Sequence, residues 1–308
     1  MSRNKKEYLL IGLKGMAMGA ADIVPGVSGG TIALIAGIYE EFVNALKSFS
    51  SALGVLKKDG LKATWKHING SFLLALFCGI AVSLVTLVQF IKYALENHAI
   101  LLWSFFFGLI VASCYFVGKM VSKWDAATII SLIVGTAAIY WVTTISPAET
   151  STSLWFVFIS GMLAICAMIL PGISGSFILV LLGKYAFIIE ALSELRIQVA
   201  ATFAAGCVVG LLSFSHFLSW MLKKYHNLTM ALLTGFMIGS LNKIWPWKKT
   251  LEWGFDRHGE KVATLEENIL PAQYDGENHL WAAIGLGLVG FFVIVVLELV
   301  AGKKTEAS

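Results

Sequence analysis

The feature that most constrains this chain is an internal repeat that interrupts two of its long apolar stretches. Gly15–Tyr39 aligns without a gap with Gly161–Tyr185, and eleven of the 25 aligned positions are identical. Each copy contains the pattern Pro-Gly-x-Ser-Gly, which starts at Pro25 in the first copy and at Pro171 in the second. Proline and glycine disfavour a continuous helix. The chain is therefore predicted to consist of two related halves, each broken at the same place.

The composition predicts a membrane protein with several spans. Of the 308 residues, 57% are hydrophobic and 14% are charged, whereas soluble domains carry about 25% charged residues. The net charge of +4 is small and the lysines form short clusters beside apolar runs, which is typical of membrane topology and indicates no nucleic-acid partner. The cysteines lie singly in apolar runs, which predicts no metal site, cofactor or disulfide; they are Cys78, Cys114, Cys166 and Cys207.

Apolar stretches of two lengths follow one another along the chain. About 20 apolar residues span a bilayer, and six stretches fit this length: residues 72–95, 99–119, 126–146, 199–222, 228–245 and 281–301. Two further regions, 9–46 and 154–192, are too long for one helix, and each has its Pro-Gly break near the middle. Each broken region is either a kinked spanning helix or a helical hairpin that enters the membrane and returns on the same side.

The distribution of lysines distinguishes these two models. Cytoplasmic loops of membrane proteins are enriched in Lys and Arg. With non-crossing hairpins, the lysine-rich loop 47–66 lies on the side of the basic N-terminus, and the loop 246–280, with four bases against seven acids, lies outside. A single crossing by each broken region would move loop 47–66 to the opposite side. The charges therefore favour hairpins, and three crossings per half would insert the second half upside down.

We therefore predict an all-α polytopic membrane protein with one membrane domain over residues 1–308 and both termini in the cytoplasm. Repeat one covers residues 8–146, and repeat two covers residues 154–301 in inverted topology. Each repeat is expected to contain a re-entrant helical hairpin followed by three transmembrane helices. Inverted repeats with broken helices are the architecture of many transporters, whose substrate sites lie where the breaks meet.

The chemistry of the two hairpin tips favours an anionic ligand. A serine at the start of a half-helix caps it, and the free amides of its first turn form a site for phosphate or carboxylate. The alternative is that the glycines only permit close helix packing. The phosphate-binding candidates are the tip residues Pro25, Gly26, Ser28, Gly29, Gly30, Thr31, Pro171, Gly172, Ser174, Gly175 and Ser176.

Four ionisable residues near the hairpins are secondary candidates. Asp22 aligns with Met168 in the other half, and an acid inside a membrane is a functional candidate; it either carries a proton in exchange for substrate or caps the neighbouring turn. Glu40 is a second candidate for proton coupling. Lys14 and Arg196 are candidates for steering an anionic headgroup, with snorkelling to the membrane surface as the alternative for both.

The motifs resemble those of a known family. "GMAMGAADIVPGVSGGTIALIAGIYE" together with "PGISGSFILVLLGKY" is similar to the bacterial polyprenyl phosphate transporters (PopT), formerly a family of unknown function, and length, repeat and span order agree along the whole chain. The resemblance implies a transporter rather than an enzyme. It implies that undecaprenyl phosphate, a lipid carrier of cell-wall synthesis, returns from the outer to the cytoplasmic leaflet of the cytoplasmic (inner) membrane. The resemblance does not indicate whether the protein is a monomer or an oligomer.

Two other functions remain alternatives. Undecaprenyl pyrophosphate phosphatases also use inverted repeats and a Pro-Gly-x-Ser loop, but in their pattern an arginine follows the serine, where this chain has Gly29 and Gly175. Without that arginine, the charge that develops during phosphoryl transfer is difficult to stabilise. A carrier of a small soluble anion is the third possibility, because helix N-termini do not distinguish a lipid phosphate from sulfate or a carboxylate.

Overall fold

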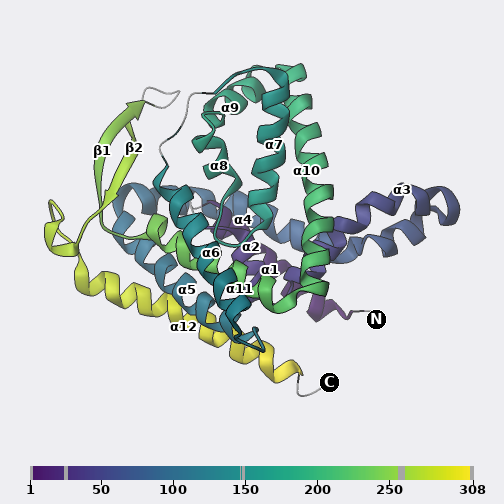
Figure 1. Cartoon of the computed structure of the whole chain (residues 1–308), viewed down its shortest axis with the longest axis horizontal. Helices are drawn as coiled ribbons and strands as arrows, with labels where there is room; N and C mark the ends of the chain where they lie inside the picture. Colours follow the sequence, from purple (N-terminus) through teal and green to yellow (C-terminus); the bar gives the residue numbers. More distant parts are fainter. Residues whose placement is uncertain (1–2, 24–26, 146, 148–149, 256–260, 306–308) are drawn as a thin grey trace.

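The chain is a helical bundle with one small β-hairpin (Figure 1). The computed structural model describes residues 3–23, 27–145, 147, 150–255 and 261–305. The helices are α1 Lys5–Ile23, α2 Gly29–Ile35, α3 Tyr39–His67, α4 Gly70–Asn97, α5 Ala99–Lys119, α6 Ala126–Thr144, α7 Leu154–Ile169, α8 Gly175–Leu181, α9 Tyr185–Ser193, α10 Ile197–Lys224, α11 His226–Ile244 and α12 Leu280–Thr305. The strands β1 Lys248–Phe255 and β2 Lys261–Asn268 and the short 3₁₀ helix Pro271–Gln273 lie between α11 and α12.

The helical, multi-span character predicted from composition is confirmed. Among the described helices, α4, α5, α6 and α10 are each long and apolar enough to cross a membrane. The pair α8 and α9, bent by 107°, would be a fifth crossing if it were one broken span. This is fewer than the six spans expected. The helix α11 carries several polar residues, and the described apolar part of α12, Leu280–Val296, is shorter than a full span.

The two broken regions fold in corresponding ways. The helix α2 packs back against α1, and α8 packs back against α7. Both short helices end in the same turn, in which Gly37 and Gly183 have φ values of 68° and 61°. The following amides, of Ile38 and Lys184, donate to Ala33 and Leu179, which is the Schellman pattern of a helix C-terminus. The repeat thus encodes the same helix end twice.

The packing of the longer helices follows the same correspondence. The helix α1 packs on α4 as α7 packs on α10, and α5 packs on α12 as α11 packs on α6. Glycines lie at these crossings: a Cβ added to Gly79 would overlap the Gly12 carbonyl, and one added to Gly206 would overlap the Phe158 carbonyl. Small residues let two helix backbones approach closely. Each half therefore contains an equivalent glycine-lined helix pair.

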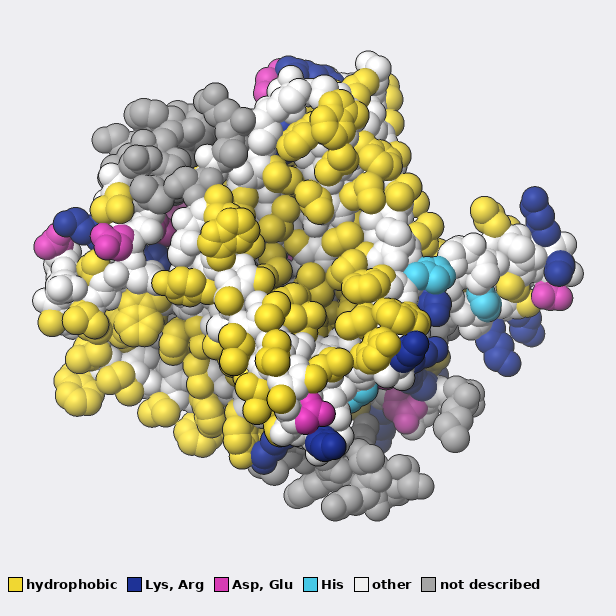
Figure 2. Space-filling model, in the orientation of Figure 1, with side chains coloured by type: hydrophobic (Ala, Val, Ile, Leu, Met, Phe, Trp, Pro, Cys, Tyr) yellow, Lys and Arg dark blue, Asp and Glu magenta, His cyan; other side chains and the backbone are white. Residues whose placement is uncertain are grey.

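Two segments that we expect from the sequence to be loops have regular structure. Residues 47–66 continue α3 as a projecting arm, which bends at Gly60, where φ is 79° (Figure 1). Lys and Arg side chains gather on this arm, whereas hydrophobic side chains cover much of the helical surface (Figure 2). The loop 246–280 contains the antiparallel pair β1 and β2, so the protein is not entirely α-helical.

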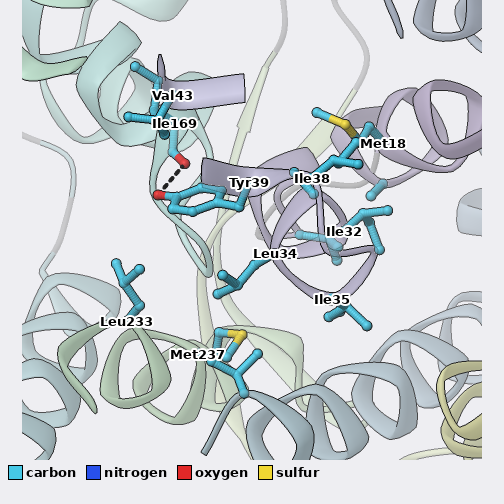
Figure 3. Packing of buried hydrophobic residues seen from close by; sticks show 14 of the residues in the cluster. Met18, Ile32, Leu34, Ile35, Ile38, Tyr39, Val43, Ile169, Leu233 and Met237 are labelled. Carbon is cyan, nitrogen blue, oxygen red and sulfur yellow. Dashed lines mark hydrogen bonds between the residues drawn. The ribbon is translucent and has the colours of Figure 1, made fainter. Parts of the chain in front are cut away.

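The core surrounds the first broken region. All seven residues of α2 are buried, whereas in α8 only Leu179 is buried. Leu34 and Ile35 of α2, together with Leu233 and Met237 of α11, belong to the main apolar cluster (Figure 3). The first hairpin is therefore embedded in the bundle, and the second is more peripheral.

Candidate functional site

The first hairpin tip is held by hydrogen bonds from its own backbone. Ser28 has an extended backbone and caps α2, because its Oγ accepts a bond from the Gly30 amide at 3.1 Å. The Gly29 amide donates to Asp22 Oδ1 at 2.7 Å. In this structure Asp22 therefore caps the neighbouring turn, which is one of the two roles expected for it. The Thr31 amide donates to the Ser28 carbonyl at 2.9 Å. The candidates Pro25 and Gly26 lie outside the described residues.

Between the described residues of the two hairpins, three hydrogen bonds connect the first hairpin directly to the second. Ser28 Oγ donates to the Leu170 carbonyl at 3.0 Å, and the Gly172 amide donates to Thr31 Oγ1 at 2.9 Å. The Tyr39 hydroxyl donates to the Ile169 carbonyl at 3.1 Å (Figure 3). Ser28, Thr31 and Tyr39 are at most 1% exposed. The structure therefore brings the two repeated motifs, 146 residues apart in sequence, into contact inside the bundle.

Glycines at the tips permit this contact. A Cβ on Gly30 would lie 2.6 Å from the Ile169 carbonyl oxygen, and a Cβ on Gly29 would lie 2.5 Å from Asp22 Oδ2. Gly172 has a φ of 83°, a conformation that favours glycine. These glycines have the packing role considered as the alternative, and they also leave backbone amides close to the junction.

The second tip is less enclosed than the first. Ser174 lies at the start of α8, but its side chain forms no capping bond to that helix; its Oγ is 2.7 Å from Ser176 Oγ. Pro171 and Gly172 are buried, Gly175 packs against the Ala164 carbonyl, and Ser176 is exposed. Lys243 of α11 lines a narrow cavity together with Gly172, Ser174 and Phe177. The second tip thus presents two hydroxyls beside a cation.

The remaining charged candidates have partners away from the two hairpin tips. Lys14 Nζ donates to the Ala36 carbonyl at the C-terminus of α2 at 2.5 Å, where a cation is favourable to the helix dipole. Glu40 lies 3.5 Å from His226, and Arg196 pairs with Glu190 and Glu194 at the exposed turn before α10.

Sequence reasoning missed the role of Tyr39. Its recurrence as Tyr185 was visible in the repeat, but the two residues differ, because Tyr39 is buried in the junction and Tyr185 is 44% exposed. The burial of each tyrosine, which the repeat does not determine, therefore decides which of the two bonds to the other hairpin. Lys243 lies beside the second tip but is distant from it in sequence, so no motif connects the two.

Comparisons with known proteins identify the family. Residues 18–262 match the family described as undecaprenyl phosphate translocase-like. A polyprenyl-phosphate transporter of Vibrio cholerae is 44% identical over 307 residues, 99% of this chain and 100% of that protein. A polyprenyl-phosphate transporter of Staphylococcus aureus is 34% identical over 254 residues, 76% of this chain and 85% of that protein. No solved structure matches the chain.

Both relatives are named as transporters and not as enzymes, in agreement with the expected class. The lipid substrate in their names, together with several apolar helices of spanning length, indicates a multi-pass membrane protein. The chain belongs to the undecaprenyl phosphate translocase-like family of polyprenyl-phosphate transporters.

Proposed function

We propose that this protein returns undecaprenyl phosphate from the outer to the cytoplasmic leaflet of the bacterial cytoplasmic membrane, holding the phosphate where the two motifs meet. The observation that carries the proposal is the direct bonding of Ser28 to Leu170 and of Thr31 to Gly172. An unpaired charge in an apolar medium costs many kcal/mol, so the headgroup needs polar groups inside the bundle. The polyprenyl tail can remain in the surrounding lipid.

In this proposal the phosphate replaces an internal carboxylate at the first tip. Asp22 Oδ1 accepts a bond from the Gly29 amide, so that amide already binds an anionic oxygen. The Ser174 and Ser176 hydroxyls at the second tip supply further donors. Protonation of Asp22 would remove its negative charge and weaken its bond to the Gly29 amide, so that the phosphate can compete for that amide. This couples proton uptake to substrate binding.

We further propose that the halves, residues 8–146 and 154–301, are inverted repeats that rock against each other, with both termini in the cytoplasm. The matched helix pairs α1–α4 and α7–α10 and the matched turns at Gly37 and Gly183 support this arrangement. In transporters of this architecture, alternating access results from motion of one repeat against the other around a fixed site.

Leaflet-resolved transport in vesicles tests the function. The full-length protein is reconstituted with undecaprenyl phosphate, and the phosphate accessible in the outer leaflet is followed over time. Ser28→Leu breaks the bond to Leu170 that joins the two tips, and Ser174→Leu removes a proposed donor to the phosphate, so each should reduce the rate at least about tenfold. Ser160→Ala is the matched control, because Ser160 bonds only to the Phe156 carbonyl of its own helix among the described contacts. Unchanged rates in both folded leucine variants would refute the site.

Asp22→Asn tests the proton coupling. Asparagine keeps an oxygen for the Gly29 amide but cannot titrate, so we expect transport whose rate no longer varies with pH. The measurement is the transport rate of wild type and variant across a pH series. A variant whose pH profile matches that of wild type would exclude Asp22 as the proton carrier.

A further inference from the structure

Hydrogen bonds join the β-hairpin between α11 and α12 to the C-terminal end of α11. Asn268 Nδ2 donates to the Asn242 carbonyl at 2.7 Å and to Asn242 Oδ1 at 2.9 Å. Trp245 Nε1 donates to the Ile269 carbonyl at 2.8 Å. These bonds fix the position of nearby hairpin residues relative to α11, and Glu266 lies two residues before Asn268.

Two lysines share the single carboxylate of Glu266. Glu266 Oε2 lies 3.4 Å from Lys243 Nζ and 3.5 Å from Lys248 Nζ. Lys248 Nζ also donates to the Lys243 carbonyl at 2.9 Å and lies 4.5 Å from the centre of the Trp103 ring. With both lysines protonated, the three side chains carry a net charge of +1. Of the carboxylates whose side chains the structure describes, Glu266 is the one that contacts both lysines, and it leaves an excess positive charge on these three side chains.

The environment of Lys248 makes that excess costly. Its side chain is only 10% exposed, and burial lowers the pKa of Lys248 to about 8, although Glu266 acts in the opposite direction. A second negative charge would be favourable here, because an opposite charge nearby stabilises a buried cation. Among the side chains that the structure describes, Glu266 alone therefore does not neutralise the two lysines completely.

The cluster adjoins the second hairpin tip. Lys243 Nζ lies 5.6 Å from the centre of the Phe177 ring, at the start of α8. Lys243 also lines the same narrow cavity as Ser174 and Gly172. An anion that replaced Glu266 on Lys243 would therefore be beside the hydroxyl of the second motif.

We propose that Lys243 and Lys248 form a capture site for a phosphate monoester next to the second hairpin tip, with Glu266 as the internal anion that the phosphate displaces. This rests on the proposed function for the identity of the substrate. A phosphate dianion neutralises two ammonium groups, whereas one carboxylate leaves one charge uncompensated. Lysine suits a transient site, because it binds phosphate as a flexible point charge and not in a fixed two-point geometry. The arrangement parallels Asp22 on the Gly29 amide at the first tip.

Binding measurements on the full-length protein in detergent test the site. The probes are farnesyl phosphate, inorganic phosphate and farnesol, and the readout is the dissociation constant from ligand-dependent tryptophan fluorescence. Lys243→Gln and Lys248→Gln should each weaken farnesyl phosphate binding about tenfold, and Glu266→Gln should strengthen it by a similar factor. Opposite signs from neighbouring substitutions cannot both result from misfolding. Lys243→Arg keeps the charge and should bind within a few-fold of wild type.

Lys249→Gln is the matched control. Lys249 lies one residue after Lys248 in β1 and pairs with Glu267 across the strands, so it faces the opposite side of the hairpin. Its substitution should leave every dissociation constant unchanged. Farnesol, which has no phosphate, should bind equally to all variants. Inorganic phosphate that competes at concentrations near those of farnesyl phosphate would identify free phosphate, and not a lipid headgroup, as the ligand.

The outcome separates this inference from the proposed function. Unchanged farnesyl phosphate binding in both Lys→Gln variants, or weaker binding in Glu266→Gln, would overturn the capture site even if the protein transports undecaprenyl phosphate. Conversely, the expected binding changes in a protein that moves no undecaprenyl phosphate between leaflets would refute the transport function and leave the phosphate site intact.

Discussion

At the scale of single residues, the junction of the two hairpins depends on side chains that are not equivalent in the repeat. Thr31 accepts a bond from the Gly172 amide, whereas the aligned residue in the second half is Phe177, which packs beside Lys243. A buried amide without a partner costs about as much as a lost hydrogen bond. Because this position is threonine in the first hairpin and phenylalanine in the second, only the first hairpin supplies here a side-chain acceptor for an amide of the other.

Thr31→Val should therefore destabilise the protein. Valine has nearly the same shape as threonine but no hydroxyl oxygen, so the Gly172 amide would lose its acceptor, at a cost of about 1–3 kcal/mol. Thermal unfolding of the purified protein measures the effect. Ser83→Ala is the control, because Ser83 Oγ is buried and has no hydrogen-bond partner among the described residues. An equal loss of stability in both variants would argue against a stabilising role for the bond between the Gly172 amide and Thr31.

Lys248→Met should stabilise the protein most at neutral pH. Burial lowers the pKa of Lys248 from 10.5 to about 8, so between these two values the unfolded chain binds more protons than the folded one. The unfolding free energy of wild type then rises with pH across this window, and the penalty is complete below pH 8. The advantage of the Met variant in melting temperature should shrink as pH rises toward 10.5. A constant difference would contradict this.

At the scale of elements, the short helices α2 and α8 end because glycine follows them at the same repeat position. The left-handed conformation of Gly37 and Gly183 allows the chain to reverse into α3 and α9. This turn accounts for one of the identical positions in the repeat, Gly37 aligned with Gly183, without any role in ligand binding. The serines and glycines at the starts of these helices, in contrast, are the ones near the junction.

Gly37→Ala should lower stability through the backbone alone. Nothing lies within 4 Å of an added Cβ there, but φ is 68°, and an L-residue in this region costs about 1–2 kcal/mol. Gly54→Ala is the matched control, because it has equal space in the α3 helix and should gain about 0.5–1 kcal/mol. Melting temperatures that move in opposite directions would support the assignment, and a stabilised Gly37→Ala protein would exclude it.

At the scale of the whole molecule, the helix pairs α1–α4 and α7–α10 pack through the same kind of contact. The crossings of α1 with α4 and of α7 with α10 both depend on glycine against a facing carbonyl, at Gly79 and Gly206. The rocking motion that we propose would require each pair to move as a unit. The central hairpin contacts lie between these units.

Gly79→Ala and Gly206→Ala should therefore have comparable effects. Each added methyl group meets a backbone carbonyl, which cannot move aside easily, and overpacking of this kind costs about 1–3 kcal/mol. Gly285→Ala in α12 is the control, because nothing lies within 4 Å of its added Cβ. Melting temperatures of the three variants check this. A loss confined to one half would show that the two helix pairs are not equivalent in stability.

Much of the architecture was predictable because its causes are local in sequence. An apolar run of bilayer length, a Pro-Gly break and two copies of a motif are properties of the chain itself, and they predicted a helical membrane protein with several spans and its family. Loop 47–66 was not recognised as helical, since its charged, mixed pattern resembles a loop. The β-hairpin was not predicted, because the bonds that hold it join Asn268 to Asn242 and Ile269 to Trp245, residues 26 and 24 positions apart in the chain.

The amino-acid sequence by itself determined where helices stop, since proline and glycine act on the backbone wherever they occur. Only the tertiary structure decided which groups meet: Thr31 with Gly172, Asp22 with Gly29, and Glu266 with two lysines. Each of these contacts satisfies a polar group that burial has removed from water. Which partner is within reach depends on how the helices pack, and the spacing of residues along the chain does not contain that information.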